Sequence, residues 1–479
     1  MNLDQSRLRS DPVALATIAE MEKRVGLDSY AVENEGIGGL LKVKISDFRV
    51  EEEFKRVSLD PKGRFSVIEV TLKNWETNRF VNRLSKELRI SRNRIWFSGT
   101  KDKRAITSQL MIIDAPMHKI EKIELGDVKI SCIGRTHQKL KFGEHLSNKF
   151  TVIVRGCAKK DGSPMNNEEA LENANKIISG MEEKIGKGLF PNWIGPQRFG
   201  GLRAVTAEVG EKVIDDDYEE AVNTYLGMVS PFESEEVIKF RTQWNETKDI
   251  EKCLEIIPNK LGFEKNMLYR LKKTNDYLSA FKTLPNNLQL MCIHAVQSKI
   301  FNKSLALRIK SNLTLNKPLI GDIVGHLNEK GNIDTKNIVI VENETLERIE
   351  RNCNLGRLAI TGPLPGFEEI IATGEIGKLE NKIINDAKFS KDSWQIEKIP
   401  RLSSSGSRRP ITSNYSNMNI EICSKEVEED NSIKWDNGPK KGDRWNPEGA
   451  SIKFKFSLPP GSYASVLLRE IMRSPINHY

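Results

Sequence analysis

A short apolar run that stops at a charged turn constrains this chain more than any other stretch. Residues 95–97 (Ile-Trp-Phe) have the character of a buried strand, and Ser98-Gly99 breaks that strand into a turn. The turn places the carboxylate of Asp102 among three cations: Lys101, Lys103 and Arg104. Opposite charges nearby favour the ionised form of a carboxylate, so we expect Asp102 to remain an anion, which suits a nucleophile.

The surroundings of this turn favour a binding role. Between Lys86 and Arg104 there are seven basic and two acidic residues, a local net charge of +5. Trp96 and Phe97 lie inside this cluster. Cations for phosphates together with rings for bases are the pattern expected of nucleic-acid contact. The competing interpretation is an ordinary solvated surface loop, which is common for a Lys-Asp-Lys-Arg turn.

Length and composition exclude several classes of protein. A chain of 479 residues predicts two or three domains. No apolar run approaches the ~18 residues of a membrane helix and the N-terminus does not read as a signal peptide, so we expect a cytoplasmic protein. Six scattered cysteines and six histidines without ligand spacing predict no metal site, disulfide or cofactor. No extended apolar stripe requires a protein partner, so we expect a monomer.

Strand-like segments at both ends of the chain predict an α+β fold. A helix capped by Thr77 is expected after a predicted strand over 64–73, and another helix is expected over 167–187. Near the C-terminus, Ser462 is expected to cap a helix over 463–473. The predicted strands cover 40–54, 64–73, 95–97, 107–114, 127–133, 149–155 and 451–458.

A second informative stretch covers residues 190–200. It combines rigid Pro and Gly turn residues with Asn192, Gln197, Arg198 and three aromatic residues, which suits a loop that hydrogen-bonds to a base and stacks on it. A turn packed by aromatic residues is the alternative interpretation. From residue 204 the sequence becomes helix-rich, with a long helix expected over 289–310. Residues 401–410 then have the composition of a flexible basic link, whose arginines either contact phosphate or are simply solvated.

Four stretches resemble the motifs of the TruD family of tRNA pseudouridine synthases. The run Gly99–Ala105 is similar to the family's catalytic motif, and the resemblance implies that Asp102 is the nucleophile. Residues 42–52 match an early motif near the active site, residues 192–200 match a second motif, and residues 458–471 match the C-terminal motif. One departure is Ile194, which stands where the family usually has an aromatic residue associated with stacking on the target uracil.

The resemblance implies the architecture and the reaction. It implies a pseudouridine synthase domain over 1–203 and 400–479, with a mixed, largely antiparallel sheet flanked by helices and a large α/β insertion domain over 204–399. The implied reaction is an isomerisation of uridine in tRNA, at uridine 13 of the D-arm, to pseudouridine. The base is detached at N1, turned and rejoined at C5. Asp102 either adds to C6 of the uracil or acts at C1′ of the ribose, and both routes remain open.

The predicted substrate is tRNA, without a cofactor. The residues expected to bind it or to support the site, from the motif matches and the residue types, are Lys42, Lys101, Lys103, Arg104, Asn192, Trp193, Ile194, Gln197, Arg198, Phe199, Ser462 and Arg469.

Two other functions are compatible with parts of the sequence. An RNA-binding module without activity would use the same cations and rings, but it would have no use for Asp102. A nucleoside glycosidase would need a second catalytic carboxylate at a fixed distance, and the matched stretches offer no obvious one.

Overall fold

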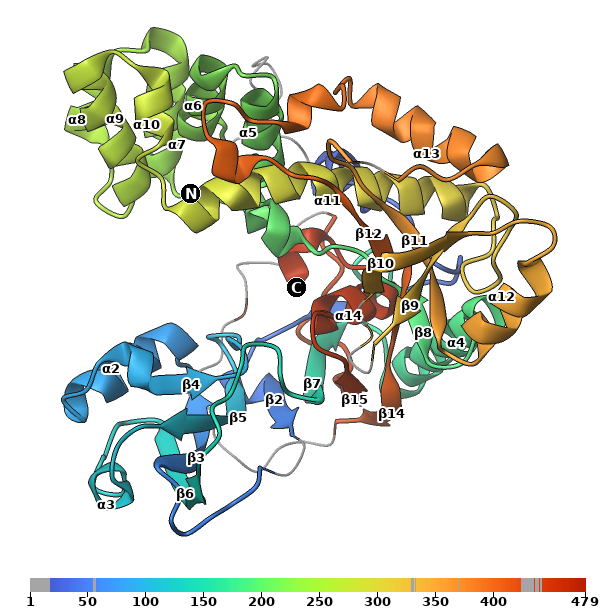
Figure 1. The fold of residues 1–479 in the computed structure, drawn as a ribbon, viewed down its shortest axis with the longest axis horizontal. Coiled ribbons are helices and arrows are strands. Elements are labelled where there is room, and N and C mark those ends of the chain that lie inside the picture. Colours follow the sequence, from blue (N-terminus) through green and yellow to red (C-terminus); the bar gives the residue numbers. More distant parts are fainter. Residues whose placement is uncertain are drawn as a thin grey trace. The chain divides into compact units, whose positions relative to one another are not determined.

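The computed structural model describes residues 18–54, 57–328, 331, 333–368, 370–423, 435, 439 and 442–479 (Figure 1). The chain forms two compact units that alternate along the sequence. Unit 1 lies within Met1–Tyr30, Pro191–Asn328 and Asn332–Thr412, and unit 2 within Ala31–Phe190, Glu329–Gly331 and Ser413–Tyr479. These units are defined by compactness alone, so the domain limits implied at 203/204 and 399/400 stay a prediction.

Unit 2 is built around one sheet. Among the described residues its strands follow the order β14-β15-β7-β2-β5-β3-β6, with β1 on β7 and β4 on β5. The β2–β5 pair is parallel and the other pairs are antiparallel, so the predicted mixed, largely antiparallel sheet is confirmed. The strands are β1 Gly38–Leu40, β2 Phe48–Glu53, β3 Phe65–Lys73, β4 Ile95–Phe97, β5 Ile106–Ile113, β6 Val128–Thr136, β7 Ser147–Cys157, β14 Ser416–Ile422 and β15 Ile452–Leu458.

Helices cover this sheet because its strands carry apolar residues at alternate positions. Ile68, Val70 and Leu72 of β3 point to one face, where they pack against Phe80 and Leu84 of α2. The helices of unit 2 are α2 Thr77–Glu87, α3 Met117–Ile120, α4 Asn167–Ile185 and α14 Ala464–Met472.

Two predicted helix caps are wrong. Glu76, not Thr77, caps α2, because its carboxylate accepts hydrogen bonds from the backbone N–H groups of the next turn. The C-terminal helix starts at Ala464 with Tyr463 at its cap position, and no side chain caps it. Ser462 instead shares a hydrogen bond of 2.6 Å between its hydroxyl and that of Ser413.

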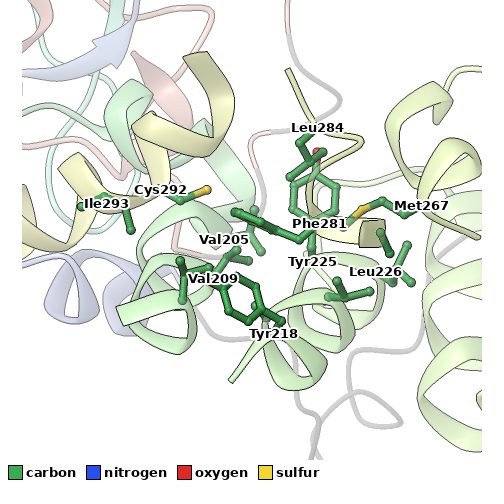
Figure 2. Close-up of a cluster of buried hydrophobic side chains, with 14 of the residues drawn as sticks. Val205, Val209, Tyr218, Tyr225, Leu226, Met267, Phe281, Leu284, Cys292 and Ile293 are labelled. Atoms are coloured by element: carbon green, nitrogen blue, oxygen red, sulfur yellow. The ribbon is translucent and has the colours of Figure 1, made fainter. Parts of the chain in front are cut away.

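Unit 1 contains a helical part with its own core. Val205, Tyr218 and Phe281 come from three different helices and meet in one buried apolar cluster (Figure 2). Trp244 of α7 is another buried member of this cluster. The helices of unit 1 are α1 Ile18–Arg24, α5 Val205–Ile214, α6 Tyr218–Gly227, α7 Glu235–Thr247, α8 Ile250–Ile256, α9 Gly262–Thr274, α10 Tyr277–Phe281, α11 Asn286–Lys310, α12 Leu346–Asn354 and α13 Gly374–Asp386.

The long helix expected over 289–310 is present as α11 (Figure 1). Its buried residues include Ile293, Lys299 and Asn302, so several sides of the helix are covered. A small sheet of order β10-β9-β11-β12 completes the unit. Its strands are β9 Ile323–Leu327, β10 Ile333–Ile340, β11 Leu358–Leu364 and β12 Ser407–Pro410, while β8 Leu189–Pro191 and β13 Thr412–Asn414 span the limits between the units.

The predicted flexible link over 401–410 is wrong, because its last four residues form strand β12, which pairs with β11. Arg408 is buried in this strand and forms a bidentate ion pair with Glu380, with nitrogen–oxygen distances of 2.8 and 2.6 Å. It also donates to Thr361. A buried guanidinium needs such partners, and nothing in the local sequence showed that Glu380 supplies them.

The Arg408–Glu380 pair yields a stability prediction. Because Glu380→Gln leaves a buried cation without its counter-charge, the free energy of unfolding should fall by about 3 kcal/mol. The exposed pair between Lys272 and Glu251 is the matched control, and Lys272→Met should leave stability nearly unchanged. Denaturant unfolding measures both, and equal effects would contradict the assignment.

Candidate active site

Asp102 lies in the loop between β4 and β5 of unit 2, and its carboxylate is accessible. About 35% of its side chain is exposed. The ammonium of Lys42 donates a hydrogen bond of 2.8 Å to Oδ1 of Asp102. The cation that contacts this carboxylate therefore comes from a position 60 residues earlier in the chain. Lys42 is one of the residues that the sequence predicts to support the site, whereas the sequence neighbours Lys101 and Arg104 bind other groups.

Arg104 holds the backbone of Lys42 in place. Lys42 has a backbone φ of 57°, a left-handed conformation that is unfavourable for residues other than glycine. The Arg104 guanidinium donates to the carbonyl oxygens of Lys42 and Val43, each at 2.7 Å. The Lys42 ammonium also lies 4.5 Å from the centre of the Phe48 ring. These contacts fix the position from which Lys42 reaches Asp102.

Lys101 is directed into the protein, away from Asp102. Its ammonium forms a salt bridge with Oε1 of Glu52, and the two side chains are 7% and 0% exposed. The hydroxyl of Ser98 donates to the same oxygen at 2.7 Å. One buried carboxylate thus holds two residues of the Asp102 loop. Glu52 belongs to the early motif, but its sequence gave no sign of this role.

Two further contacts anchor the loop. The backbone N–H of Lys101 donates to the hydroxyl of Thr77 at 2.9 Å. Thr77 is available for this bond because Glu76 caps the helix. The side-chain amide of Gln109 donates to the carbonyl oxygen of Gly99 at 3.5 Å.

The turn before β2 is held by a buried ion pair. The Arg155 guanidinium contacts both carboxylate oxygens of Asp47 at 2.6 to 2.8 Å. Oδ2 of Asp47 also accepts from the backbone N–H of Lys44 at 2.7 Å. The turn that follows Lys42 is therefore tied to strand β7.

Burial raises the pKa of Glu52 above its usual value. The attraction of Lys101 and the hydrogen bonds from Lys101 and Ser98 lower this pKa, but removal from water is the larger effect. Removal from water thus penalises the charged form of Glu52 by more than Lys101 and Ser98 stabilise it.

The second motif belongs to unit 1, where its residues are mostly packed. Asn192 uses both ends of its amide: Oδ1 accepts from Arg409 at 2.6 Å and Nδ2 donates to the carbonyl of Pro410 at 2.9 Å. Trp193 and Phe199 are fully buried in the structure, and Ile194 nearly so.

A residue missed by the sequence analysis holds this segment. The side chain of Asn302 on α11 accepts from the backbone N–H of Ile194 and donates to its carbonyl, both at 2.9 Å. A single asparagine inside a long helix gives no sequence signal of such a contact. By contrast, Gln197 is exposed and Arg198 is half-buried, so both present polar atoms to solvent.

The remaining predicted residues differ in exposure. Lys103 is exposed beside Asp102. Arg469 is buried in α14, where its guanidinium lies 3.4 Å from Oε1 of Glu470. Glu470 in turn accepts from the backbone N–H of Ala31 at 2.8 Å. Arg469 thus contributes to the interior of unit 2.

The described residues contain neither a candidate metal site nor a helix that could span a membrane. No group of three or more His, Cys, Asp or Glu side chains there could hold a metal ion. None of the helices in the same ranges is long and apolar enough to cross a membrane.

Comparisons with known proteins agree over nearly the whole chain. A family model described as "tRNA pseudouridine synthase D (TruD)" matches residues 24–471. A protein of Methanosarcina acetivorans named "Probable tRNA pseudouridine synthase D" is 36% identical, covering 95% of this chain and 97% of the relative. A protein of the same name from Archaeoglobus fulgidus is 32% identical, covering 95% and 100%.

A solved structure has the same fold. The crystal structure of a candidate tRNA pseudouridine synthase D from Methanosarcina mazei superposes with a TM-score of 0.81 and is 33% identical. The match covers 96% of this chain and 99% of the other. The α+β fold class expected from the sequence is thereby confirmed.

The buried Glu52–Lys101 pair predicts a pH-dependent stability. Because the folded state binds the Glu52 proton more tightly than the unfolded state, this group's contribution is lost as pH rises above the ordinary value of 4.5. The double variant Glu52→Gln/Lys101→Met should lack this slope. Melting temperatures measured from about pH 4 to 7 compare the two proteins. Parallel curves would contradict the assignment.

Proposed function

This chain belongs to the TruD family of tRNA pseudouridine synthases, and we propose that it converts uridine 13 in the D-arm of tRNA to pseudouridine, with Asp102 as the nucleophile. The observation that carries the proposal is the accessible Asp102 carboxylate held by Lys42. It combines an exposed oxygen nucleophile with a cation that stabilises its charge.

The reaction is an isomerisation that needs no second reactant. The bond between N1 of the uracil and C1′ of the ribose breaks, the base turns, and a bond forms between C5 and C1′. The proton on C5 leaves the base and N1 gains a proton. Asp102 either adds to C6 of the uracil or attacks C1′, and it is released when the new bond has formed. The uridine must leave its stack to reach the carboxylate.

The residues around Asp102 divide the supporting work. Lys42 orients the carboxylate through its hydrogen bond and places a positive charge beside it. Arg104 keeps Lys42 in its left-handed conformation. The salt bridge between Lys101 and Glu52 fixes the loop and occupies the ammonium of Lys101, while Lys42 contacts Asp102.

Exposed cations are the proposed RNA contacts. Lys103 extends from the Asp102 loop into solvent, and Arg198 and Gln197 present polar groups from the second motif. We propose that these residues bind phosphates or bases, while Asn192, Trp193, Ile194 and Phe199 shape the second motif by packing.

The remaining assignments rest on the family. We propose that residues 204–399 form the TruD-type insertion and that residues 1–203 and 400–479 form the catalytic domain. Because tRNA is a cytoplasmic substrate, we place the activity in the cytoplasm, and the monomeric state stays a prediction.

The first test replaces the nucleophile. Asp102→Asn should lower pseudouridine formation at least a hundredfold, because the amide is no longer an anionic nucleophile, and it should leave tRNA affinity nearly unchanged. Pseudouridine is mapped by carbodiimide primer extension on an unmodified tRNA transcript. Pseudouridine at position 13 with the wild type alone supports reaction, site and nucleophile together.

An RNA-binding module without activity predicts a different result. Wild type and Asp102→Asn would then bind the transcript and modify none, and the variant would bind more tightly because a negative charge is removed from among cations.

The second test separates Lys42, which contacts Asp102, from the exposed Lys103. Lys42→Met should lower kcat by about tenfold to a hundredfold and change KM little, because it removes the partner of Asp102. Lys103→Met is the matched control and should raise KM with kcat unchanged, because it removes a phosphate contact. Equal effects on kcat would contradict these roles.

A further inference from the structure

Unit 1 contains a cavity far from Asp102 in sequence. It has a volume of about 510 Å³ and is formed by α1, α11, α13 and the segment after α1. Helices α11 and α13 run side by side over part of their length (Figure 1). Its charged residues are Glu20, Lys23, Arg24, Asp28, Lys303 and Lys310.

The cations of this cavity exceed its acids. Lys310 forms an ion pair of 2.7 Å with Asp28, so these two charges compensate each other. Lys23, Arg24 and Lys303 have neither a hydrogen bond nor an ion pair from their side chains within the described residues. Glu20 remains as the one other acid of the lining. The charged residues of the lining, four basic and two acidic, therefore carry a formal net charge of +2.

Lys303 is the strongest evidence for an anionic ligand. Its side chain is half-buried, and burial, reinforced by the charge of Lys299, lowers its pKa. Three nearby carboxylates, Glu211, Glu208 and Asp386, raise this pKa in part. Lys299, however, takes Glu208 and Glu211 as its own partners at 3.1 and 2.8 Å. A half-buried ammonium without a partner is costly, and an anion in the cavity would remove that cost.

We propose that this cavity binds a phosphate group of the tRNA backbone, an inference that rests on the proposed function. The cavity volume lies in the range of roughly 300 to 1,000 Å³ that is usual for small-ligand sites. The cavity is therefore larger than one phosphate group and has room for the ribose attached to that phosphate. Arg24 offers the planar fork that matches phosphate oxygens, and two lysines add point charges. The contact carries no sequence information, and it orients the RNA on unit 1.

The experiment measures tRNA binding by fluorescence anisotropy at several salt concentrations between about 50 and 200 mM. Lys303→Gln and Arg24→Gln should each weaken binding about two- to fivefold and reduce the slope of log Kd against log salt by about one. Lys303→Arg should retain tRNA binding, because it keeps the positive charge. In all three variants, kcat at saturating tRNA should equal that of the wild type. The control Lys239→Gln removes an exposed cation from α7 and should have no effect.

The outcomes separate the possibilities. Wild-type affinity in folded Lys303→Gln and Arg24→Gln would overturn the proposal. If inorganic phosphate raises the Tm of the wild type but not of Lys303→Gln, while tRNA affinity is the same in both, the cavity binds a free phosphate compound and the assignment to RNA is wrong. A wild type that binds tRNA through these residues but forms no pseudouridine supports this inference and contradicts the proposed function.

Discussion

The buried carboxylate of Glu52 determines how the charges of the Asp102 loop are arranged. The side chain of Glu52 has no exposed surface, so its ionised form requires a cation and hydrogen bonds inside the protein. Lys101 and Ser98 supply them. If Lys101 turned towards Asp102, a charge would be left unpaired in the interior. Lys101, one of the two lysines adjacent to Asp102 in sequence, is therefore unavailable to it, and the cation that contacts Asp102 is Lys42.

The topology of the sheet makes that partnership possible. Strands β2 and β5 are parallel neighbours, with Arg49 opposite Ile106 and Glu51 opposite Ser108. Parallel strands start at the same edge of a sheet, so the segments that precede them lie close together. Lys42 stands before β2, and Asp102 stands before β5. One parallel pair in an otherwise antiparallel sheet thus brings two distant motifs to a single site.

Local sequence patterns predicted the helices and strands, whereas the long-range contacts between side chains could be identified only in the folded chain. Alternation gave the strand over 65–73 and periodicity gave the helix α11, because both signals depend on residues close in sequence. The pairing of Arg408 with Glu380 and the hold of Asn302 on Ile194 could not be predicted, because long-range contacts leave no local trace. The cap at Glu76 was missed since Thr77, beside it, is the better capping residue by type.

The same limit applies to charge, because sequence does not distinguish a structural cation from a ligand-binding one. Arg155, Arg308 and Arg408 each face a buried carboxylate, so each adds nothing to the field outside the protein. The formal excess of +8 must then lie on cations without such partners. Lys103 is one of these cations and Lys303 is another. A polyanionic substrate is attracted by this remainder, so the buried pairs decide which lysines and arginines are left to bind RNA.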